Sequence, residues 1–460
     1  MSFTDTEKFL KELKNTLSDK VIINKEDLYV YAYDTSQNPD KTILPLAVVF
    51  PHERTDVVKT LKLAYKYSVS VVARAQGTNH CGSTRPVENS IILHFAHMNK
   101  ILDIDKINLT AVVEPNVIIG DLNHKLDELN LFFPPDPSNL AVSTVAGAIA
   151  LCSGGPRTFK YGNTKDYIIN LEVVLANGEI IETSKNLSKN VTGYNLTSLF
   201  VGSEGTLGII TKATLKLIPK PQMRLLTLAY FDTLNDAANC SNKIISSGLI
   251  PSALDLIDKV TMRTIENFNP CNLMINKEAA LLIELDGFKH NVQYESELLR
   301  KILKENKAVN VVSAKNEIEN ENIWKARRSA FSALAQLKPN IVTEDIVVPR
   351  DKIVQFINKI SELSKKYDII TATMGHIADG NIHPNFALDL KHEKEKFEHL
   401  KDELFYYALS IGGTLSGEHG IGSHKQKYLK MALDENAHKL MKQIKVLLDE
   451  KDILNSGKSL

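Results

Sequence analysis

The segment MGHIADGNIHPNF, residues 374–386, constrains the fold more than any other part of the chain, because it predicts a β-hairpin. The dipeptide Asp379-Gly380 is typical of two-residue hairpin turns. A two-residue turn would place His376 opposite His383, with their Cβ atoms roughly 5 Å apart on one face. Asn385 would lie on the same face, one step along the strand. Two imidazoles at this separation can bind one metal ion, so the hairpin is a candidate metal site.

A second polar cluster, Gly417-Glu418-His419-Gly420, adds a carboxylate and another imidazole. Adjacent residues of an extended strand point to opposite faces, so both side chains can reach one centre only if the flanking glycines let the chain bend. His376, His383 and Glu418 together offer two nitrogens and one carboxylate, a set that suits Zn²⁺, Mn²⁺ or Fe²⁺. Such a cation lowers the pKa of a hydroxyl group bound to it, and His419 could accept the proton as general base. The competing interpretation is a structural hairpin with surface histidines.

Arg327 is a candidate ligand for a substrate carboxylate. It shares helical spacing with Trp324, Phe331 and Leu334, which places it on an apolar seam where an unpaired charge is costly. A bidentate carboxylate partner would remove that cost. That partner can be the substrate, or it can be internal, with Glu344 or Asp345 as candidates.

Composition limits the class of protein. The chain has 460 residues, 43% of them hydrophobic, which predicts two or more domains with substantial cores. Lys plus Arg and Asp plus Glu both number 55, so the formal net charge is zero and nucleic-acid binding is not expected. The four cysteines form no CxxC pair, which argues against an iron–sulfur cluster or a Cys-type zinc site in this chain and fits a reducing compartment.

The sequence also limits membrane association. The N-terminal residues have no apolar signal core, and no stretch is apolar over the length of a bilayer span. We therefore expect a cytoplasmic protein without a transmembrane segment, with peripheral membrane contact only through a partner.

The order of predicted elements indicates an α+β fold. Short apolar runs alternate with helical ones in the first part, and strands dominate residues 168–218. Pro219-Lys220-Pro221 marks a boundary. A second region of strands and helices follows, and the last fifty residues are largely helical and could pack back on the first region. The predicted domains are residues 1–221, 222–410 and 411–460.

Three segments of the first region are rich in glycine and other small residues: residues 74–82, 134–162 and 202–210. Successive backbone N–H groups in the first segment would form an anion-binding nest suited to a pyrophosphate. This segment has neither the three-glycine dinucleotide fingerprint nor the Walker lysine. Each segment alone is also compatible with an ordinary loop, tight turn or helix–sheet junction. Together they favour a large phosphate-bearing cofactor.

These segments, followed by GHIADGNIHPN and GEHGIG, resemble the vanillyl-alcohol oxidase/PCMH superfamily. Within it the chain is similar to the branch of FAD-linked D-2-hydroxyacid dehydrogenases: D-lactate dehydrogenase, the catalytic glycolate oxidase subunit and D-2-hydroxyglutarate dehydrogenase. The resemblance extends from Thr4 to Lys458. It implies a two-subdomain PCMH-type FAD-binding domain at 1–221 and an α/β cap domain with an antiparallel sheet at 222–410. It also implies that 411–460 returns to the FAD domain and closes the active site.

The resemblance also implies roles for individual residues. His376, His383 and Glu418 would hold the metal, His419 would be the base, and Arg327 and Asn385 would contact substrate. The residues implied to bind FAD are Arg74, Ala75, Gln76, Gly77, Thr78, Asn79, Gly82, Pro137, Ser143, Thr144, Gly147, Ser153, Gly154, Tyr161, Gly162, Glu204, Gly205, Gly208, Ile209 and Ile210.

The chain departs from the family pattern at a few positions. Ala75, Ser83 and Ala148 stand where glycines are usual, and Ser456 stands where proline is common. We expect FAD binding to persist in spite of these changes. Covalent relatives attach the flavin to a histidine four residues after the loop arginine. This chain has Thr78 there, which predicts non-covalent FAD.

The implied reaction is oxidation of a D-2-hydroxyacid to the 2-oxoacid by hydride transfer to flavin N5. D-lactate is the first expectation, and glycolate or D-2-hydroxyglutarate the next. The electrons would leave to an iron–sulfur subunit, an electron-transferring flavoprotein or a quinone, and the resemblance favours a protein partner. A homodimer is one option for the oligomeric state. The alternatives are a metallohydrolase built on the same histidines and a non-catalytic or electron-transfer flavoprotein subunit of a larger oxidase.

Overall fold

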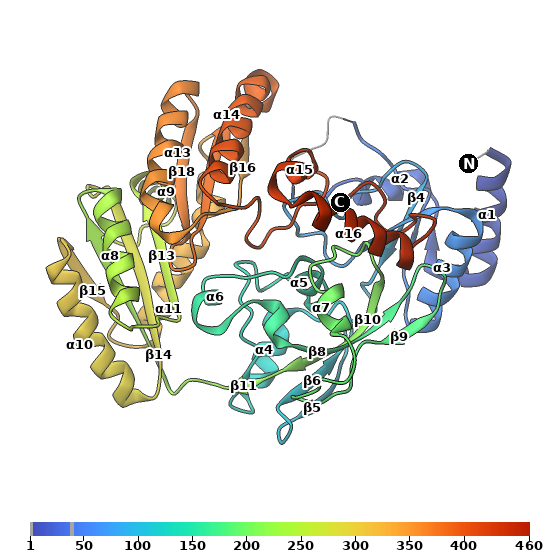
Figure 1. Ribbon diagram of the computed structural model, residues 1–460, viewed down its shortest axis with the longest axis horizontal. Helices are drawn as coiled ribbons and strands as arrows, with labels where there is room; N and C mark the ends of the chain where they lie inside the picture. The colour runs from blue at the N-terminus through green and yellow to red at the C-terminus, as the bar shows by residue number, and fades with distance from the viewer. Residues whose placement is uncertain (1–2, 37–40) are drawn as a thin grey trace. The chain divides into compact units, whose positions relative to one another are not determined.

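The computed structural model describes residues 3–36 and 41–460 and divides the chain into two compact units. Unit 1 comprises Met1–Ser153, Asn163–Lys220 and Glu418–Leu460, and unit 2 comprises Gly154–Gly162 and Pro221–Gly417 (Figure 1). This division differs from the expected one by a single residue at Pro221, which belongs to unit 2, and more widely in two other places. The C-terminal segment joins unit 1 from Glu418 rather than from residue 411, and Gly154–Gly162 groups with unit 2.

The first sheet of unit 1 has the order β1-β2-β4-β3. Its three longer strands run parallel, and β1 is antiparallel to β2. Strands β2 and β4 are buried along almost their whole length, as expected when a parallel sheet is covered on both faces. Helix α3 packs here because Val57, Leu61 and Ala64 recur at helical spacing and are fully buried. The elements are α1 (Phe3–Leu17), η1 (Ser18–Lys20), β1 (Val21–Ile22), α2 (Lys25–Leu28), η2 (Tyr29–Tyr31), β2 (Ala47–Val49), α3 (Arg54–Tyr67), β3 (Ser70–Arg74) and β4 (Ser90–His94).

The second sheet of unit 1 is antiparallel, with the order β5-β6-β10-β8-β9. The C-terminal segment returns to the first sheet, where Leu454 forms a parallel bridge with Val71. The elements are β5 (Ile101–Asp105), β6 (Thr110–Val113), α4 (Ile119–Asp127), β7 (Leu131–Phe132), α5 (Val145–Leu151), η3 (Thr164–Tyr167), β8 (Ile168–Val174), β9 (Ile180–Glu182), α7 (Leu196–Phe200), β10 (Ile209–Lys216), β11 (Ile218–Pro219), η5 (Gln426–Tyr428), α15 (Leu429–Ala432) and α16 (Glu435–Leu448).

Unit 2 is built on one antiparallel sheet of order β15-β12-β14-β13-β18-β19-β16, with β17 also paired to β19. The strands are β12 (Met223–Phe231), β13 (Ala253–Asp258), β14 (Ala279–Gly287), β15 (Asn310–Ser313), β16 (Asn340–Thr343), β17 (Ile346–Val347), β18 (Ile370–His376) and β19 (Asn381–Leu388). The helices are α6 (Thr158–Tyr161), α8 (Leu234–Ser246), α9 (Lys259–Phe268), α10 (Lys289–Glu305), α11 (Glu317–Arg328), α12 (Ala330–Leu334), η4 (Arg350–Lys352), α13 (Ile353–Tyr367) and α14 (Leu390–Ser410).

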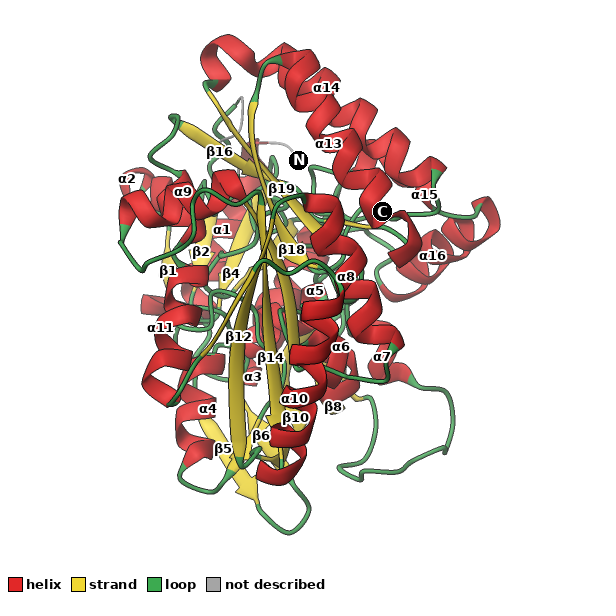
Figure 2. Ribbon diagram, turned by 90° about the vertical axis from the view of Figure 1, so that its left-hand side faces the viewer, coloured by secondary structure: helices red, strands yellow, loops and turns green. Residues whose placement is uncertain are grey.

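Helices cover the sheet of unit 2 on both sides. Figure 2 shows α11 on one side of β12 and β14, with α10 on the other. On the α11 side, Leu228, Leu282 and Ile257 pack against Trp324 and Leu334. Side chains along a strand point alternately to opposite faces, and paired residues share a face. Asp255 and its partner His376 therefore lie on the face that α11 covers.

The predicted hairpin forms, but its predicted register is wrong. The connection between β18 and β19 is a four-residue loop rather than a two-residue turn, so His376 lies opposite Asn381. His383 instead lies opposite Met374. The backbone O of Val348 would lie 2.1 Å from a Cβ on Gly380, so contact with this neighbouring segment helps to shape the loop.

Among residues 3–36 and 41–460, no helix combines sufficient length with sufficient apolar character to cross a bilayer.

Candidate active site

The histidines of the hairpin lie together in unit 2 in spite of the changed register. His376 and His383 are diagonal neighbours on one face, and their ring centroids are 5.2 Å apart in an edge-to-face arrangement. Their exposed fractions are only 2% and 6%. They are therefore not surface histidines, and the competing interpretation of the hairpin is not supported on this point.

Asp255, on the adjacent strand β13, orients His376. Its Oδ1 lies 2.7 Å from His376 Nδ1. With the proton on Nδ1, the ring keeps the lone pair of Nε2 for a metal, as in the carboxylate–histidine–metal arrangement. Burial alone would raise the pKa of Asp255, but His376 and Arg327 outweigh burial and lower that pKa.

Arg327 has an internal partner, but neither of the two that the sequence suggested. Its Nε donates to Asp255 Oδ2 over 2.9 Å, and its side chain is 9% exposed. The buried side chains of His376, Asp255 and Arg327 thus form one connected polar group. The expected contact of Arg327 with substrate stays a prediction.

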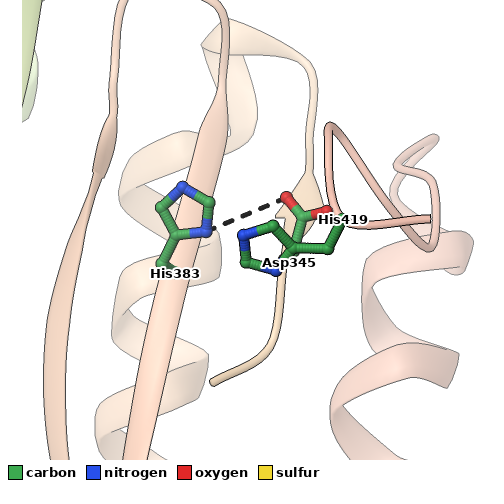
Figure 3. Close-up of side chains that lie close together, drawn as sticks. All are labelled: Asp345, His383 and His419. Carbon is green, nitrogen blue, oxygen red and sulfur yellow. Dashed lines mark ion pairs between the residues drawn. The ribbon is translucent and has the colours of Figure 1, made fainter. Parts of the chain in front are cut away.

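Asp345 stands beside the second histidine. Figure 3 shows its carboxylate facing the ring of His383, with 3.8 Å between Oδ1 and Nδ1. The other oxygen, Oδ2, accepts hydrogen bonds from Ser416 Oγ and from the backbone N–H of Gly417. Asp345 therefore connects His383 to the residue that directly precedes Glu418 in the chain.

Two asparagines of β19 differ in how far the sheet itself occupies their side chains. Asn385 Oδ1 accepts from Thr343, and its Nδ2 donates to the backbone oxygens of His383 and Ala372, so the sheet already uses this side chain. Its expected contact with substrate stays a prediction. Asn381 shares the face and is 6% exposed, and within the described residues its Oδ1 has no hydrogen-bond partner. Such a buried acceptor calls for a ligand or water, and the sequence analysis missed it.

Unit 1 carries the remaining candidate residues of the polar cluster. Glu418 Oε1 lies 3.8 Å from His419 Nε2, and both side chains are largely buried. The His419 ring lies beside His80 of the first glycine-rich loop, with 5.1 Å between centroids. The bend that Gly420 was expected to permit is present, since its φ is +86°.

The first glycine-rich loop turns at two glycines and carries several backbone donors. Gly77 and Gly82 adopt positive φ, and within the described part of the chain the backbone N–H groups of Gln76, Gly77 and Thr78 have no hydrogen-bond partner. Asn79 shapes the loop from inside, because its Oδ1 accepts from the backbone N–H groups of Cys81 and Ser83. This segment can therefore present several donors to a pyrophosphate.

Other residues expected at the cofactor are occupied by the protein itself. Thr144 caps α5 by accepting from Gly147 N. Tyr161 donates to Asp286 Oδ2 within unit 2. Glu204 accepts from the backbone N–H groups of Ile421 and Gly422. The expected FAD contacts of these side chains stay predictions.

Asp255 is the main site residue that sequence reasoning missed. Strand β13, ALDLID, is apolar except for Asp255 and Asp258, whose spacing of three puts them on opposite faces, so no period-2 pattern marks Asp255 in the sequence. The pairing of Asp255 with Arg327 and His376 is a tertiary contact over 72 and 121 residues, so no local pattern predicts it.

Two family profiles match the chain in tandem. The family described as "FAD binding domain" matches residues 45–184. The family described as "FAD linked oxidases, C-terminal domain" matches residues 220–459.

Proteins with similar sequences match this chain over most of its length. "Glycolate oxidase subunit GlcD" of Bacillus subtilis is 44% identical over 93% of this chain and 91% of that protein. "D-lactate dehydrogenase" of Archaeoglobus fulgidus is 36% identical over 89% of this chain and 90% of that protein. A solved structure of p-cresol methylhydroxylase superposes with a TM-score of 0.83, covering 100% of this chain and 97% of that one, at 17% identity. The predicted fold and the predicted resemblance are thus confirmed.

Proposed function

Because the chain belongs to the FAD-linked oxidases, and is therefore an FAD-linked oxidoreductase, we propose that it oxidises a small D-2-hydroxyacid to the 2-oxoacid. FAD, when bound, supplies the two-electron acceptor for this reaction. D-lactate, the first expectation from the sequence, and glycolate, the next, are the candidate substrates that the names of relatives at 36% and 44% identity support. D-2-hydroxyglutarate is the third.

We propose that His376, His383 and Glu418 hold one divalent cation, Zn²⁺, Mn²⁺ or Fe²⁺. The observation that carries this proposal is the buried imidazole pair, with Asp255 on Nδ1 of His376 and Asp345 beside His383. Asp255 is within hydrogen-bond distance of His376, so it sets the tautomer and raises the basicity of that imidazole, whereas Asp345 at 3.8 Å places a carboxylate near His383. The donor set therefore fits a metal, which would supply Lewis acidity to a hydroxyl and carboxylate bound together.

The remaining residues bind substrate and move its proton in this proposal. His419 accepts the hydroxyl proton, and its neighbour Glu418 lies close enough to stabilise the resulting imidazolium. Arg327 orients the substrate carboxylate with its Nη groups, while its Nε stays bonded to Asp255. Asn381 offers a buried oxygen that can accept a hydrogen bond at the same face.

We further propose that FAD is bound without a covalent bond, because Thr78 replaces the histidine that would form one. The electrons then pass to a partner protein. The relative from Bacillus subtilis is named as a subunit of an oxidase, which supports such a partner. An iron–sulfur subunit, an electron-transferring flavoprotein and a quinone remain the candidate acceptors.

The proposal is tested by anaerobic titration of the purified yellow protein with D-lactate, glycolate, D-2-hydroxyglutarate and L-lactate, with flavin absorbance as the readout. We expect at least one of the first three to bleach the flavin stoichiometrically and L-lactate to leave it oxidised. Acid precipitation of the same protein should release the flavin into the supernatant. A flavin that no member of the panel bleaches would contradict the proposed reaction.

A further inference from the structure

Glu204 is a buried carboxylate that binds backbone rather than solvent. It is 6% exposed. Its Oε1 accepts from the N–H of Ile421 and its Oε2 from the N–H of Gly422, both over 2.8 Å. Gly420 packs on the same carboxylate, since an added Cβ there would lie 3.0 Å from Oε1. Three consecutive residues after His419 are thus in contact with one side chain.

The backbone of Glu204 is itself held in place. Its φ of +52° is unusual for a residue with a side chain, and such strain persists only where the surroundings enforce it. Its N–H donates to Ala150 O over 2.8 Å, and its O accepts from Asn455 Nδ2 over 2.6 Å. Glu204 therefore connects the residue 202–208 loop, helix α5 and the C-terminal tail to residues 420–422.

Burial raises the pKa of Glu204, while the bonds from Ile421 and Gly422 favour its ionised form, in which both bonds are charge-assisted. Bonds of this kind are about twice as strong as neutral ones. Adjacent N–H groups held by one carboxylate fix the direction of the chain at that point. Glu418 and His419 directly precede this point, so the orientation of both side chains depends on it.

We propose that Glu204 is a positioning residue of the active site. Its carboxylate fixes residues 420–422 and thereby aims Glu418 and His419, and it does not bind FAD. The inference rests on the proposed function for the roles of Glu418 and His419. The anchoring itself rests only on contacts within unit 1.

The test compares Glu204→Gln with Glu172→Gln as a matched control. Glu172 is also a buried carboxylate of unit 1, but it bonds Arg54, Thr211 and Lys212. In Glu204→Gln the amide NH₂ would face one of the two N–H donors, so one bond is lost. Hydrogen exchange of peptides covering residues 418–424 should be at least about tenfold faster in Glu204→Gln and unchanged in Glu172→Gln.

Two further readouts separate positioning from cofactor binding. We expect Glu204→Gln to retain FAD with wild-type affinity, to bind Mn²⁺ roughly 10–100-fold more weakly, and to recover flavin reduction when Mn²⁺ is added in excess. Gly420→Ala provides a second variant, in which Glu204 is intact but the added Cβ displaces the loop. It should weaken Mn²⁺ binding in the same way.

An unchanged rate of hydrogen exchange at residues 418–424 in Glu204→Gln would overturn the inference. Loss of FAD from this variant without any change in hydrogen exchange would also overturn it. The exchange measurement does not depend on catalysis. A wild-type protein that binds no Mn²⁺ and is reduced by no hydroxyacid would therefore contradict the proposed function. Faster hydrogen exchange in Glu204→Gln would still support the role of Glu204 in fixing residues 420–422.

Discussion

At the scale of single residues, two buried ion pairs of unit 2 lie on one face of the sheet. Arg157 donates from Nε and Nη2 to Glu284, and Trp324 Nε1 donates to the same carboxylate over 2.7 Å. Arg327 and Asp255 form the next pair. Removing one partner of such a pair leaves an uncompensated buried charge, which is strongly destabilising.

Glu284 gives a pH-dependent prediction. Burial alone would raise its pKa, but Arg157 outweighs burial and lowers the pKa to about 2 from an ordinary value of 4.5. The folded carboxylate therefore contributes stability that is fully present above about pH 4.5 and is lost as pH falls towards 2. The free-energy difference between wild type and Glu284→Gln should shrink by on the order of 3 kcal/mol between pH 5 and 2. Urea unfolding at several pH values measures it, and a pH-independent difference would contradict the assignment.

Arg327 shows how far the sequence alone leads at this scale. Helical spacing correctly predicted that its charge is buried and requires a partner. The partner is Asp255, which lies 72 residues away on a strand that was not predicted. Spacing within a helix reports which face is buried, whereas the identity of a tertiary partner depends on strand order.

At the scale of elements, the sequence predicted the hairpin correctly but predicted the wrong length for its turn. Asp379-Gly380 favours a two-residue turn, but β17 and the segment after it pair with β19 and hold a wider loop. The histidines stay on one face, because a shift of two positions preserves the alternation. The face of each side chain was therefore predictable from the sequence, while the register depended on a third strand.

The loop geometry gives a prediction with an internal control. Gly380 and Gly248 both have positive φ, +82° and +90°, so alanine should cost roughly 1–2 kcal/mol at either position. At Gly380 the new Cβ would also lie 2.1 Å from Val348 O, whereas at Gly248 it meets nothing within 4 Å. Gly380→Ala should therefore lose roughly 2 kcal/mol more than Gly248→Ala in urea unfolding. Equal losses would show that the Val348 contact is unimportant.

At the scale of the whole molecule, the residues proposed to act together belong to different parts of the chain. His376 and His383 belong to unit 2, whereas Glu418 and His419 belong to unit 1, immediately after the peptide bond from Gly417. Motif order in the sequence predicted the family and the fold, since both profiles match in that order. In the metal proposal, unit 2 supplies the two imidazoles and unit 1 supplies the carboxylate.

The most direct test of this account is flavin reduction before and after removal of the metal. The protein is dialysed anaerobically against a chelator, mixed with the hydroxyacid that bleaches the untreated flavin, and then supplied with one equivalent of Mn²⁺ or Zn²⁺. We predict that the stripped protein keeps its yellow FAD, is not bleached, and recovers bleaching with the added metal. Bleaching at the untreated rate in protein shown to be free of metal would contradict the account.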